Sequence, residues 1–538
     1  MRFDGHGGDA AVAALRGFGV EEMFTLSGGH VFPLYDAAVR AGIRIVDVRH
    51  EQTAVFAAEG TAKLTRRPGL AVVTAGPGVT NAISAVTSAY FTGSPLVVLA
   101  GRAPTVNWGR GGLQELDHVP LVAPVTKFAA TAGTSGEIAS TVQAAALAAM
   151  TPHFGPAFVD VPMDVLFSPA VGELEPVSLP SPVAADPDEV AAVARLLATA
   201  ERPAVIVGGD VYFGRAEHAL RRAAEALRLP VFANGLGRGC LPAGHELAFA
   251  RTRGLLRRES DLVAVVGTPL DFRLGFGDFG AARVIHVTDV PDRIGRHAIL
   301  AASAAGDLAG ILDGLAAWSG DRADHEPWLS RLRAAEQAAR AAEAETFAAS
   351  TNPLRPPQVY GELRRHLDRD AVVIGDGGDF VSYAGKYLDS YQPGCWLDPG
   401  PYGCLGTGLG YATAARLARP ANQVVLLLGD GAAGFSLLDV DTLVRHQLPV
   451  VIVVGNNSGW GLEKHPMRAI YGYDVAAELA VETRYDQVVR ALGGAGELVR
   501  TGADLGAALD RGFAAGVPYL VNVITDPADA YPRSSVLA

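Results

Sequence analysis

A carboxylate and an amide follow two predicted strands near the end of the chain. Asp430 follows the apolar run 424–428 after a single glycine, and Asn457 follows the apolar run 450–454. The stretch 435–447 between them has a helical spacing of apolar residues. A strand–helix–strand unit of this length makes two parallel strands with a right-handed crossover. We therefore expect both side chains at the same carboxyl edge of a sheet, where open α/β sheets bind ligands.

These two side chains predict a site for a magnesium ion and a phosphate. One carboxylate and one amide oxygen make part of the octahedral oxygen shell that Mg²⁺ requires, and waters and phosphate oxygens usually complete it. Gly429, Gly431 and Ala432 flank Asp430 at the predicted start of the helix, where free backbone N–H groups can meet a phosphate. Either short motif alone is more often an ordinary turn, but the two stand on matching strand ends.

A second group of candidate residues lies near the start of the chain. Glu51 opens a predicted helix over 52–64, where an acidic residue ordinarily interacts with the helix dipole. Gly76 and Pro77 follow another apolar run and lead to Asn81. Glycine in such a loop lets the backbone approach a ligand closely.

The elements that must position these residues predict an α/β fold. Apolar runs of strand length alternate with helical stretches along the whole sequence, which favours three Rossmann-like, doubly wound domains with mostly parallel sheets. Proline-rich breaks at 176–187 and 351–357 separate the predicted domains. Their expected boundaries are 1–170, 188–340 and 355–538.

Composition excludes several classes of function. The 538 residues carry a formal net charge of −12, which gives no basic field for nucleic acid. No apolar run reaches the length of a membrane span, and the N-terminus lacks the apolar core of a signal peptide. The three cysteines have neither metal-ligand nor disulfide spacing. These features predict a soluble, cytoplasmic protein.

The motif GDG at 429–431, followed by a crossover and Asn456-Asn457, resembles the signature of thiamine diphosphate enzymes. The order of the domains is similar to the superfamily of acetolactate synthase, benzaldehyde lyase and oxalyl-CoA decarboxylase, with acetolactate synthase catalytic subunits most alike. The resemblance implies that thiamine diphosphate binds through Mg²⁺, held by the side chains of Asp430 and Asn457 and by the Gly459 carbonyl.

The resemblance also implies roles for the other candidates. It places Glu51 against the aminopyrimidine N1′, where proton exchange activates the cofactor, and the loop of Gly76, Pro77 and Asn81 beside the pyrimidine. Leu405 matches the apolar residue that props the cofactor in its bent shape, and Asp376 and Gly377 would lie near the diphosphate. In this family the first domain of one subunit faces the third domain of another. A homodimer or homotetramer with sites at the subunit interface is therefore expected, and a small regulatory subunit stays open.

Substrate-side residues are also implied by resemblance. Gly28-Gly29-His30 resembles a benzaldehyde lyase motif whose histidine faces the substrate carbonyl, and Gln114 matches an active-site glutamine of acetolactate synthases and benzaldehyde lyase. For His30, a proton shuttle and a structural role are equally favoured. The expected substrates are 2-oxo acids or aldehydes.

The central section resembles FAD-carrying relatives only in part. The similar residues are 235–239, Gly267, Asp271, Arg273 and Asp289. His153 and Pro269 replace two arginines that are usual in FAD-binding members, so FAD is not favoured. Relatives that handle coenzyme A would need a basic cleft. The one local basic cluster, Arg251, Arg253, Arg257 and Arg258, is interpreted as a solvated helix face.

The sequence therefore predicts a Mg²⁺-dependent, decarboxylating carboligase of the acetolactate synthase type, as in branched-chain amino acid biosynthesis. The alternative is a lyase acting on 2-hydroxy ketones or 2-hydroxyacyl-CoA, like benzaldehyde lyase or the oxalyl-CoA decarboxylase branch. An alternative of another class is a non-catalytic regulatory homologue, which the intact Glu51, Asp430 and Asn457 disfavour. An NAD-dependent dehydrogenase is discounted because no GxGxxG follows Gly208-Gly209.

Overall fold

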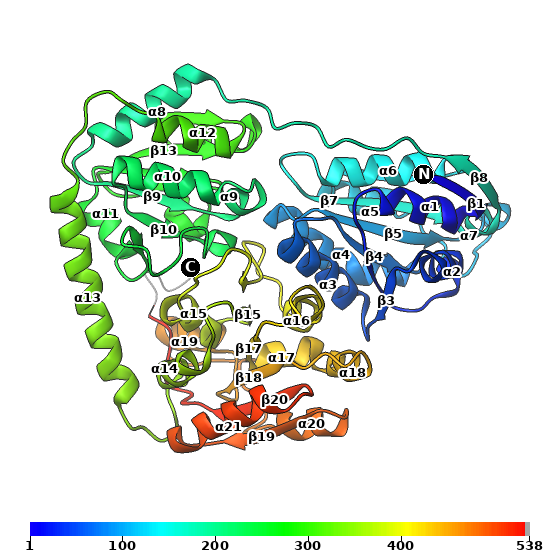
Figure 1. The fold of residues 1–538 in the computed structure, drawn as a ribbon. Coiled ribbons are helices and arrows are strands. Elements are labelled where there is room, and N and C mark those ends of the chain that lie inside the picture. The colour runs from blue at the N-terminus through cyan, green and yellow to red at the C-terminus, as the bar shows by residue number, and fades with distance from the viewer. Residues whose placement is uncertain (533–538) are drawn as a thin grey trace.

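The computed structural model describes residues 1–532 and contains three six-stranded parallel sheets. Helices cover both faces of each sheet (Figure 1). The predicted fold class of three Rossmann-like α/β units is confirmed. A separate two-stranded antiparallel ribbon pairs β1 (Arg2–His6) with β8 (Pro169–Glu173). No helix within residues 1–532 is both long and apolar enough to span a membrane.

The first sheet has the strand order β3-β2-β4-β5-β7-β6. Its strands are β2 (Glu22–Thr25), β3 (Arg44–Asp47), β4 (Gly69–Val73), β5 (Leu96–Arg102), β6 (Phe128–Thr131) and β7 (Pro156–Pro162). Its helices are α1 (Gly7–Arg16), α2 (Phe32–Ala41), α3 (Glu51–Thr65), α4 (Pro77–Thr92), α5 (Val119–Val122), α6 (Ile138–Ala149) and α7 (Met163–Phe167).

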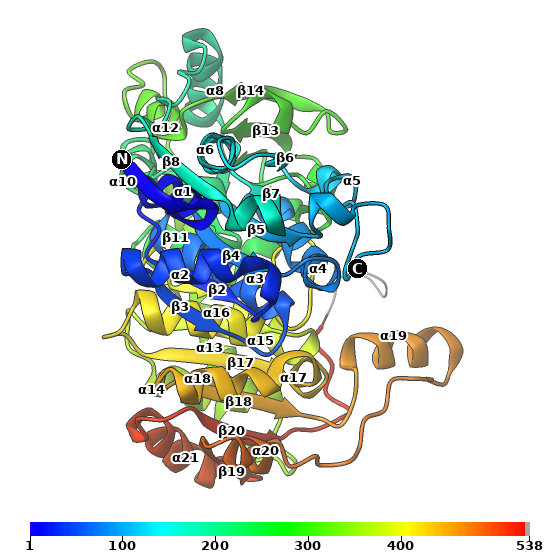
Figure 2. The ribbon, with the colours of Figure 1, turned by 90° about the vertical axis from the view of Figure 1, so that its right-hand side faces the viewer.

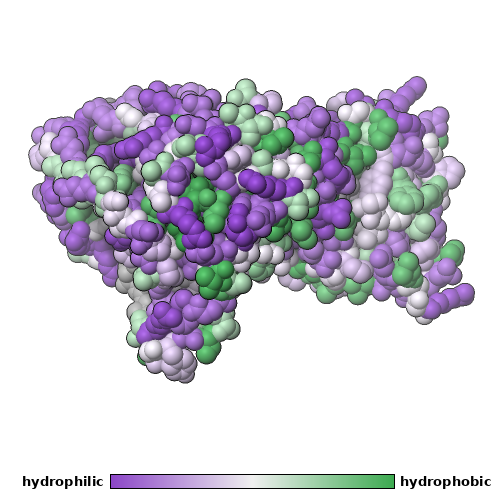
Figure 3. Space-filling view, turned by 90° about the horizontal axis from the view of Figure 1, so that it is seen from below, coloured by the Kyte–Doolittle hydropathy of each residue, from purple (hydrophilic) through white to green (hydrophobic). Residues whose placement is uncertain are grey.

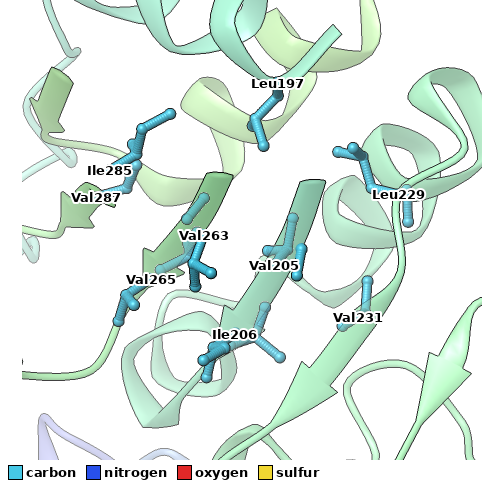
Figure 4. Close-up of a cluster of buried hydrophobic side chains, with 14 of the residues drawn as sticks. Leu197, Val205, Ile206, Leu229, Val231, Val263, Val265, Ile285 and Val287 are labelled. Carbon is cyan, nitrogen blue, oxygen red and sulfur yellow. The ribbon is translucent and has the colours of Figure 1, made fainter. Parts of the chain in front are cut away.

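The central sheet has the order β11-β10-β9-β12-β13-β14. Its strands are β9 (Pro203–Val207), β10 (Val231–Ala233), β11 (Ala248–Phe249), β12 (Leu262–Val266), β13 (Arg283–Thr288) and β14 (Leu300–Ala305). Its helices are α8 (Pro187–Thr199), α9 (Gly209–Phe213), α10 (Glu217–Leu227), α11 (Leu256–Glu259), α12 (Leu308–Ala316) and α13 (Glu326–Ala348). Branched side chains such as Val205, Ile206 and Val263 fill its core (Figure 4), as both faces of a buried parallel sheet require.

The third sheet has the order β16-β15-β17-β18-β20-β19. Its strands are β15 (Val372–Asp376), β16 (Trp396–Leu397), β17 (Val424–Gly429), β18 (Val451–Asn456), β19 (Ala495–Val499) and β20 (Tyr519–Ile524). Its helices are α14 (Pro356–His366), α15 (Asp379–Tyr387), α16 (Thr407–Ala418), α17 (Asp430–Ser436), α18 (Val440–Arg445), α19 (Gly461–Tyr471), α20 (Tyr485–Ala491) and α21 (Gly502–Ala514).

The first and third units pack on each other through α3 and α16, which lie side by side (Figures 1 and 2). Glycines permit this approach: a Cβ on Gly410 would lie 2.7 Å from Phe56, and one on Gly60 would lie 2.9 Å from Ala414. A buried ion pair within α3, between Lys63 and Glu59 (2.8 Å), bonds to the Tyr411 hydroxyl of α16: Lys63 donates to it (2.8 Å) and it donates to Glu59 (2.8 Å). This packing places the candidate residues of the first unit and those of the third unit on the same side of the contact between the two units.

Candidate functional site

The two predicted metal ligands leave neighbouring strands. Gly429 at the end of β17 pairs in register with Gly455 on β18, so no strand lies between them. Asp430 and Asn457 follow directly at this shared carboxyl edge. A Cβ on Gly429 would meet no atom within 4 Å, so the strand end opens onto free space.

Asp430 has a buried carboxylate that accepts hydrogen bonds from backbone N–H groups of the two loops at this edge. Its Oδ1 accepts the Gly431 N–H (3.0 Å) and its Oδ2 accepts the Gly459 N–H (3.2 Å). Burial raises its pKa to about 6, because the charged form loses hydration. No basic side chain forms an ion pair with it among the described residues. A divalent cation would supply the missing positive charge, so the donor set suits Mg²⁺.

The two successive asparagines at the end of β18 have different surroundings. The Asn456 amide donates to the Thr483 carbonyl (3.0 Å) and to Asn522 (3.1 Å), which ties it to the rest of the sheet. The half-buried Asn457 forms no side-chain hydrogen bond within residues 1–532, so its amide oxygen is free for a ligand. The surroundings of the two residues therefore favour Asn457 as the ligand.

Trp460 lies three residues after Asn457, in the segment 457–466 that follows the predicted metal loop and was expected to contact the substrate. Its indole covers Gly431 so closely that a Cβ there would lie 2.7 Å from the ring. Phe435 packs edge-on against the same indole, with ring centroids 6.3 Å apart. Glycine at 431 is therefore required by this ring as well as by any phosphate.

Asp376 positions the loop that carries Leu405. Its two oxygens accept the N–H groups of Gly406 (3.1 Å) and Gly408 (2.8 Å), and burial raises its pKa to about 7. Its carboxylate is thus occupied by the backbone at the start of α16. Gly377, which follows Asp376, has a φ of +133° and lies close to the end of β17. A Cβ built on Gly377 would lie only 3.1 Å from the Gly429 nitrogen.

Glu51 faces this loop from the start of α3. The side chain is buried, and its Oε2 accepts the Asn81 amide N–H (3.0 Å). The next residue, Gln52, donates from Nε2 to the Leu405 carbonyl (3.4 Å). The start of α3, which carries Glu51, therefore adjoins the Leu405 loop within a single copy of the chain.

The loop before α4 is held by a buried histidine. Gly76 has φ of +58°, a left-handed conformation that favours glycine, and its N–H donates to His118 Nε2 (2.9 Å). His118 Nδ1 lies 2.8 Å from Asp160 Oδ2, and both side chains are fully buried. Sequence reasoning missed His118 and Asp160, because only the fold brings residues so distant in sequence together.

The two predicted substrate-side residues, His30 and Gln114, are linked through Thr74. His30 Nδ1 is 3.1 Å from Thr74 Oγ1, and that hydroxyl donates to Gln114 Oε1 (3.4 Å). A Cβ on Gly76 would lie 3.0 Å from Gln114. Burial lowers the pKa of His30, so the neutral ring dominates near neutral pH. Through Gly76 and Pro77 this group adjoins the helix that carries Asn81.

The central unit corrects one sequence interpretation. The Arg251 side chain is only 1% exposed, and Arg251 and Arg253 line a cavity of about 730 Å³. The interpretation of this cluster as a solvated face is therefore wrong for these two residues, whereas Arg257 and Arg258 are exposed. Among the residues compared with FAD-binding members, Arg273 pairs with Asp271 (2.7 Å) and His153 with Asp289 (3.0 Å).

Comparisons with known proteins cover the same three units. Models of thiamine pyrophosphate enzymes match residues 5–121 (N-terminal TPP binding domain), 190–315 (central domain) and 376–523 (C-terminal TPP binding domain). The chain is 52% identical to "Acetolactate synthase large subunit IlvG" of Mycobacterium tuberculosis, over 99% of this chain and 98% of the relative. It is equally similar to a "Probable acetolactate synthase" of Mycobacterium bovis.

More distant relatives include "2-hydroxyacyl-CoA lyase 2" of Mus musculus, 34% identical over 91% of this chain and 84% of the relative. The three matched domains and the full-length identity agree with the adjoining strand ends and buried glutamate described above. The chain therefore belongs to the thiamine pyrophosphate enzymes and is an acetolactate synthase-like member that uses thiamine diphosphate.

Proposed function

We propose that this enzyme decarboxylates pyruvate and joins the remaining two-carbon unit to a second 2-oxo acid or an aldehyde, giving acetolactate or a related acyloin. The observation that carries the proposal is the buried Glu51 beside Asn81, with its neighbour Gln52 on the Leu405 carbonyl, in a chain that also keeps Asp430 and Asn457 on adjoining strand ends. The 52% identity to acetolactate synthases supports this substrate class.

Thiamine diphosphate, when bound, supplies the carbon nucleophile and the electron sink for breaking and forming bonds beside a carbonyl. Asp430, Asn457 and the Gly459 carbonyl would hold Mg²⁺, and Gly431 and Ala432 would offer N–H groups to the diphosphate. Asp376 and Gly377 would position the loop beside it. This assignment rests on the free oxygen of Asn457 and on the buried Asp430, with which no basic side chain of residues 1–532 forms an ion pair.

Glu51 would hold a proton at the pyrimidine, and Asn81 would keep its carboxylate in place. Gly76 and Pro77 would let the backbone approach the pyrimidine, and Leu405 would support the bent cofactor. His30 and Gln114 would orient the substrate carbonyl. A neutral His30, bonded to Thr74, suits a hydrogen-bonding role near neutral pH.

The assembly we propose is a cytoplasmic homodimer or homotetramer of three-domain subunits, with domains at 1–170, 188–340 and 355–538. Exposed apolar side chains on and after α19, including Tyr471 and Tyr473, support a covered surface.

The test is to incubate the purified protein with thiamine diphosphate, Mg²⁺ and pyruvate, and to follow CO₂ and acetolactate with and without FAD. Acetolactate formed without FAD is the expected result. Absence of CO₂ release, together with cleavage of benzoin or a 2-hydroxyacyl-CoA, would replace the carboligase with a lyase.

That lyase is the second candidate function. The specific observation in its favour is the basic cavity of about 730 Å³, which pyruvate chemistry does not require. The "2-hydroxyacyl-CoA lyase 2" relatives, at 34% identity, support the same alternative.

A further inference from the structure

A carboxylate of the third unit holds the start of α3, the helix that carries Glu51. This carboxylate belongs to Asp439, the last residue of the 3-10 turn Leu437–Asp439, which follows α17 directly. Its Oδ1 accepts the Arg49 N–H (2.7 Å), and its Oδ2 accepts the Thr53 hydroxyl (2.6 Å). Arg49 stands two residues before Glu51 and Thr53 two residues after it. One side chain therefore bridges the short segment in which Glu51 lies.

The bridge is buried, so water cannot replace its partners. Asp439 is 2% exposed and Thr53 is 1% exposed. The Thr442 hydroxyl lies 3.3 Å from Asp439 Oδ1, so this oxygen has a further donor beside it. Hydrogen bonds to a charged acceptor are shorter and stronger than those between neutral groups. A buried carboxylate that lost these donors would carry a large desolvation cost, so the side chain is held in this one arrangement.

Other contacts already supply capping and packing at this place. The end of α3 is capped within its own unit, because His50 Nδ1 accepts the Gln52 N–H (3.1 Å). The two units are also joined by the packing of α3 on α16 and by the pair of Arg445 with Asp47 (2.7 Å). The contribution of Asp439 beyond these contacts is a fixed position of 49–53 relative to the segment that begins with Asp430.

This position matters for the proton that Glu51 exchanges. The Glu51 carboxylate is held by the Asn81 amide (3.0 Å), but its backbone is held by the bridge from Asp439. Proton exchange requires the two heavy atoms to come within hydrogen-bond distance. A displacement of about 1 Å can slow a reaction about 100-fold. A shift of 49–53 would therefore impair the exchange even though Glu51 itself was intact.

We propose that Asp439 is a positioning residue for Glu51. Through the Arg49 N–H and the Thr53 hydroxyl it fixes where the Glu51 carboxylate meets the pyrimidine, and it thereby sets the rate at which the bound cofactor is activated. Asp439 acts through Glu51 and is assigned no contact with the cofactor or the substrate. The inference rests on the role proposed for Glu51 and deepens it, and it holds for either a carboligase or a lyase.

Exchange of the thiazolium C2 proton of bound thiamine diphosphate for deuterium tests this proposal on the holoenzyme. The exchange is stopped with acid and followed by proton NMR at saturating cofactor. Asp439→Ala should slow it at least about tenfold, because Arg49 and Thr53 lose their shared acceptor. Asp439→Asn should exchange at close to the wild-type rate. Its amide oxygen can accept the Arg49 N–H, and its NH₂ group can donate to the Thr53 hydroxyl.

The matched control is Asp504→Ala. Asp504 also accepts a threonine hydroxyl in the third unit, from Thr501 (2.6 Å), but this pair is exposed and lies at the start of α21. The control should exchange C2 deuterium like the wild type. Thr53→Val removes one of the two bonds and leaves Asp439 in place, so it should slow exchange by a smaller factor. This variant decides the question if Asp439→Ala does not fold.

Amide hydrogen exchange of the cofactor-free protein gives a second readout. Asp439→Ala should speed exchange in peptides that cover 49–53, whereas Asp504→Ala should leave those peptides unchanged. The proposal is overturned by wild-type C2 exchange in Asp439→Ala, by equal slowing in Asp439→Asn and Asp439→Ala, or by unchanged amide exchange at 49–53.

Glu51→Gln, measured in the same way, separates this proposal from the role of Glu51. Slow C2 exchange in Glu51→Gln with a wild-type rate in Asp439→Ala would keep the role of Glu51 and refute that of Asp439. A wild-type rate in Glu51→Gln would refute both. Neither readout uses pyruvate, so a failure of the proposed substrate would leave these results unchanged.

Discussion

The chemistry proposed for Glu51 depends on a single charge in a buried position. Within residues 1–532 its carboxylate receives the Asn81 amide but forms no ion pair. A carboxylate placed in this way, without a neighbouring cation, stays available to accept a hydrogen bond from a ligand ring. A substitution that keeps the contact with Asn81 but removes the charge can therefore test the chemical role of Glu51 without removing its contact within the fold.

Replacing Glu51 with glutamine should abolish turnover while leaving cofactor binding largely intact. The amide keeps the shape and the contact with Asn81, but it cannot exchange a proton, so we expect a loss of at least about 100-fold in kcat. CO₂ release from pyruvate and thiamine diphosphate affinity should be measured together. Glu21→Gln, on an exposed side chain, is the matched control. Full activity in Glu51→Gln would refute the assignment.

His118 should act through the loop that it holds. In His118→Ala the Gly76 N–H loses its buried acceptor, and Asp160 loses one of its partners. We expect a loss of roughly 1–3 kcal/mol in the free energy of unfolding. We also expect weaker thiamine diphosphate binding, because the Gly76 loop would no longer be fixed. Urea denaturation and cofactor titration give the two readouts, and an unchanged cofactor affinity would leave His118 with a purely structural role.

At the scale of elements, the sequence predicted best where the pattern was local. The helix expected over 52–64 is found as Glu51–Thr65, and the bounds of the strands expected at 424–428 and 450–454 lie within two residues of those of β17 and β18. The helix expected over 435–447 is broken instead by a 3-10 turn at Leu437–Asp439. In that turn the Asp439 carboxylate accepts the Arg49 N–H (2.7 Å) and the Thr53 hydroxyl (2.6 Å). No local pattern could reveal a partner so distant in the chain.

This turn gives a prediction about pH. Burial raises the pKa of Asp439, so the folded protein binds a proton there more readily than the unfolded chain. The contribution of Asp439 to stability should therefore fall as pH rises from the ordinary carboxyl pKa through the raised folded value. Asp439→Asn, which stays neutral, should lose that decline and gain stability relative to wild type as pH increases. The free energy of unfolding of both proteins should be measured by urea denaturation from about pH 4.5 to about pH 8, a range that starts just above the ordinary carboxyl pKa of about 4. Parallel dependences of this free energy on pH in the two proteins would contradict the prediction.

At the scale of the whole molecule, α19 and the segment after it form a lobe that stands away from the third unit. Figure 2 shows the helix projecting to the side, and Figure 3 shows the same lobe with hydrophobic and hydrophilic residues mixed on its surface. Tyr471, Tyr473 and Val475 are each more than 60% exposed. Solvent exposure of so many apolar side chains on one projection is typical of a surface that a partner covers. The sequence did not predict this exposure, because aromatic and branched residues such as Tyr471, Tyr473 and Val475 are equally common in a protein core.

A second copy of the chain is the partner that we expect on this lobe, because the homo-oligomer that the family resemblance implies needs a covered surface. The double substitution Tyr471→Glu and Tyr473→Glu should shift the protein towards monomer in sedimentation velocity, because buried unpaired carboxylates oppose association. Val171→Glu is the control, at an exposed apolar position on β8, in a different unit. If catalysis requires the dimer, activity of the double variant should rise with protein concentration as the dimer forms. A double variant that sediments as the wild type would place the subunit interface elsewhere on the molecule.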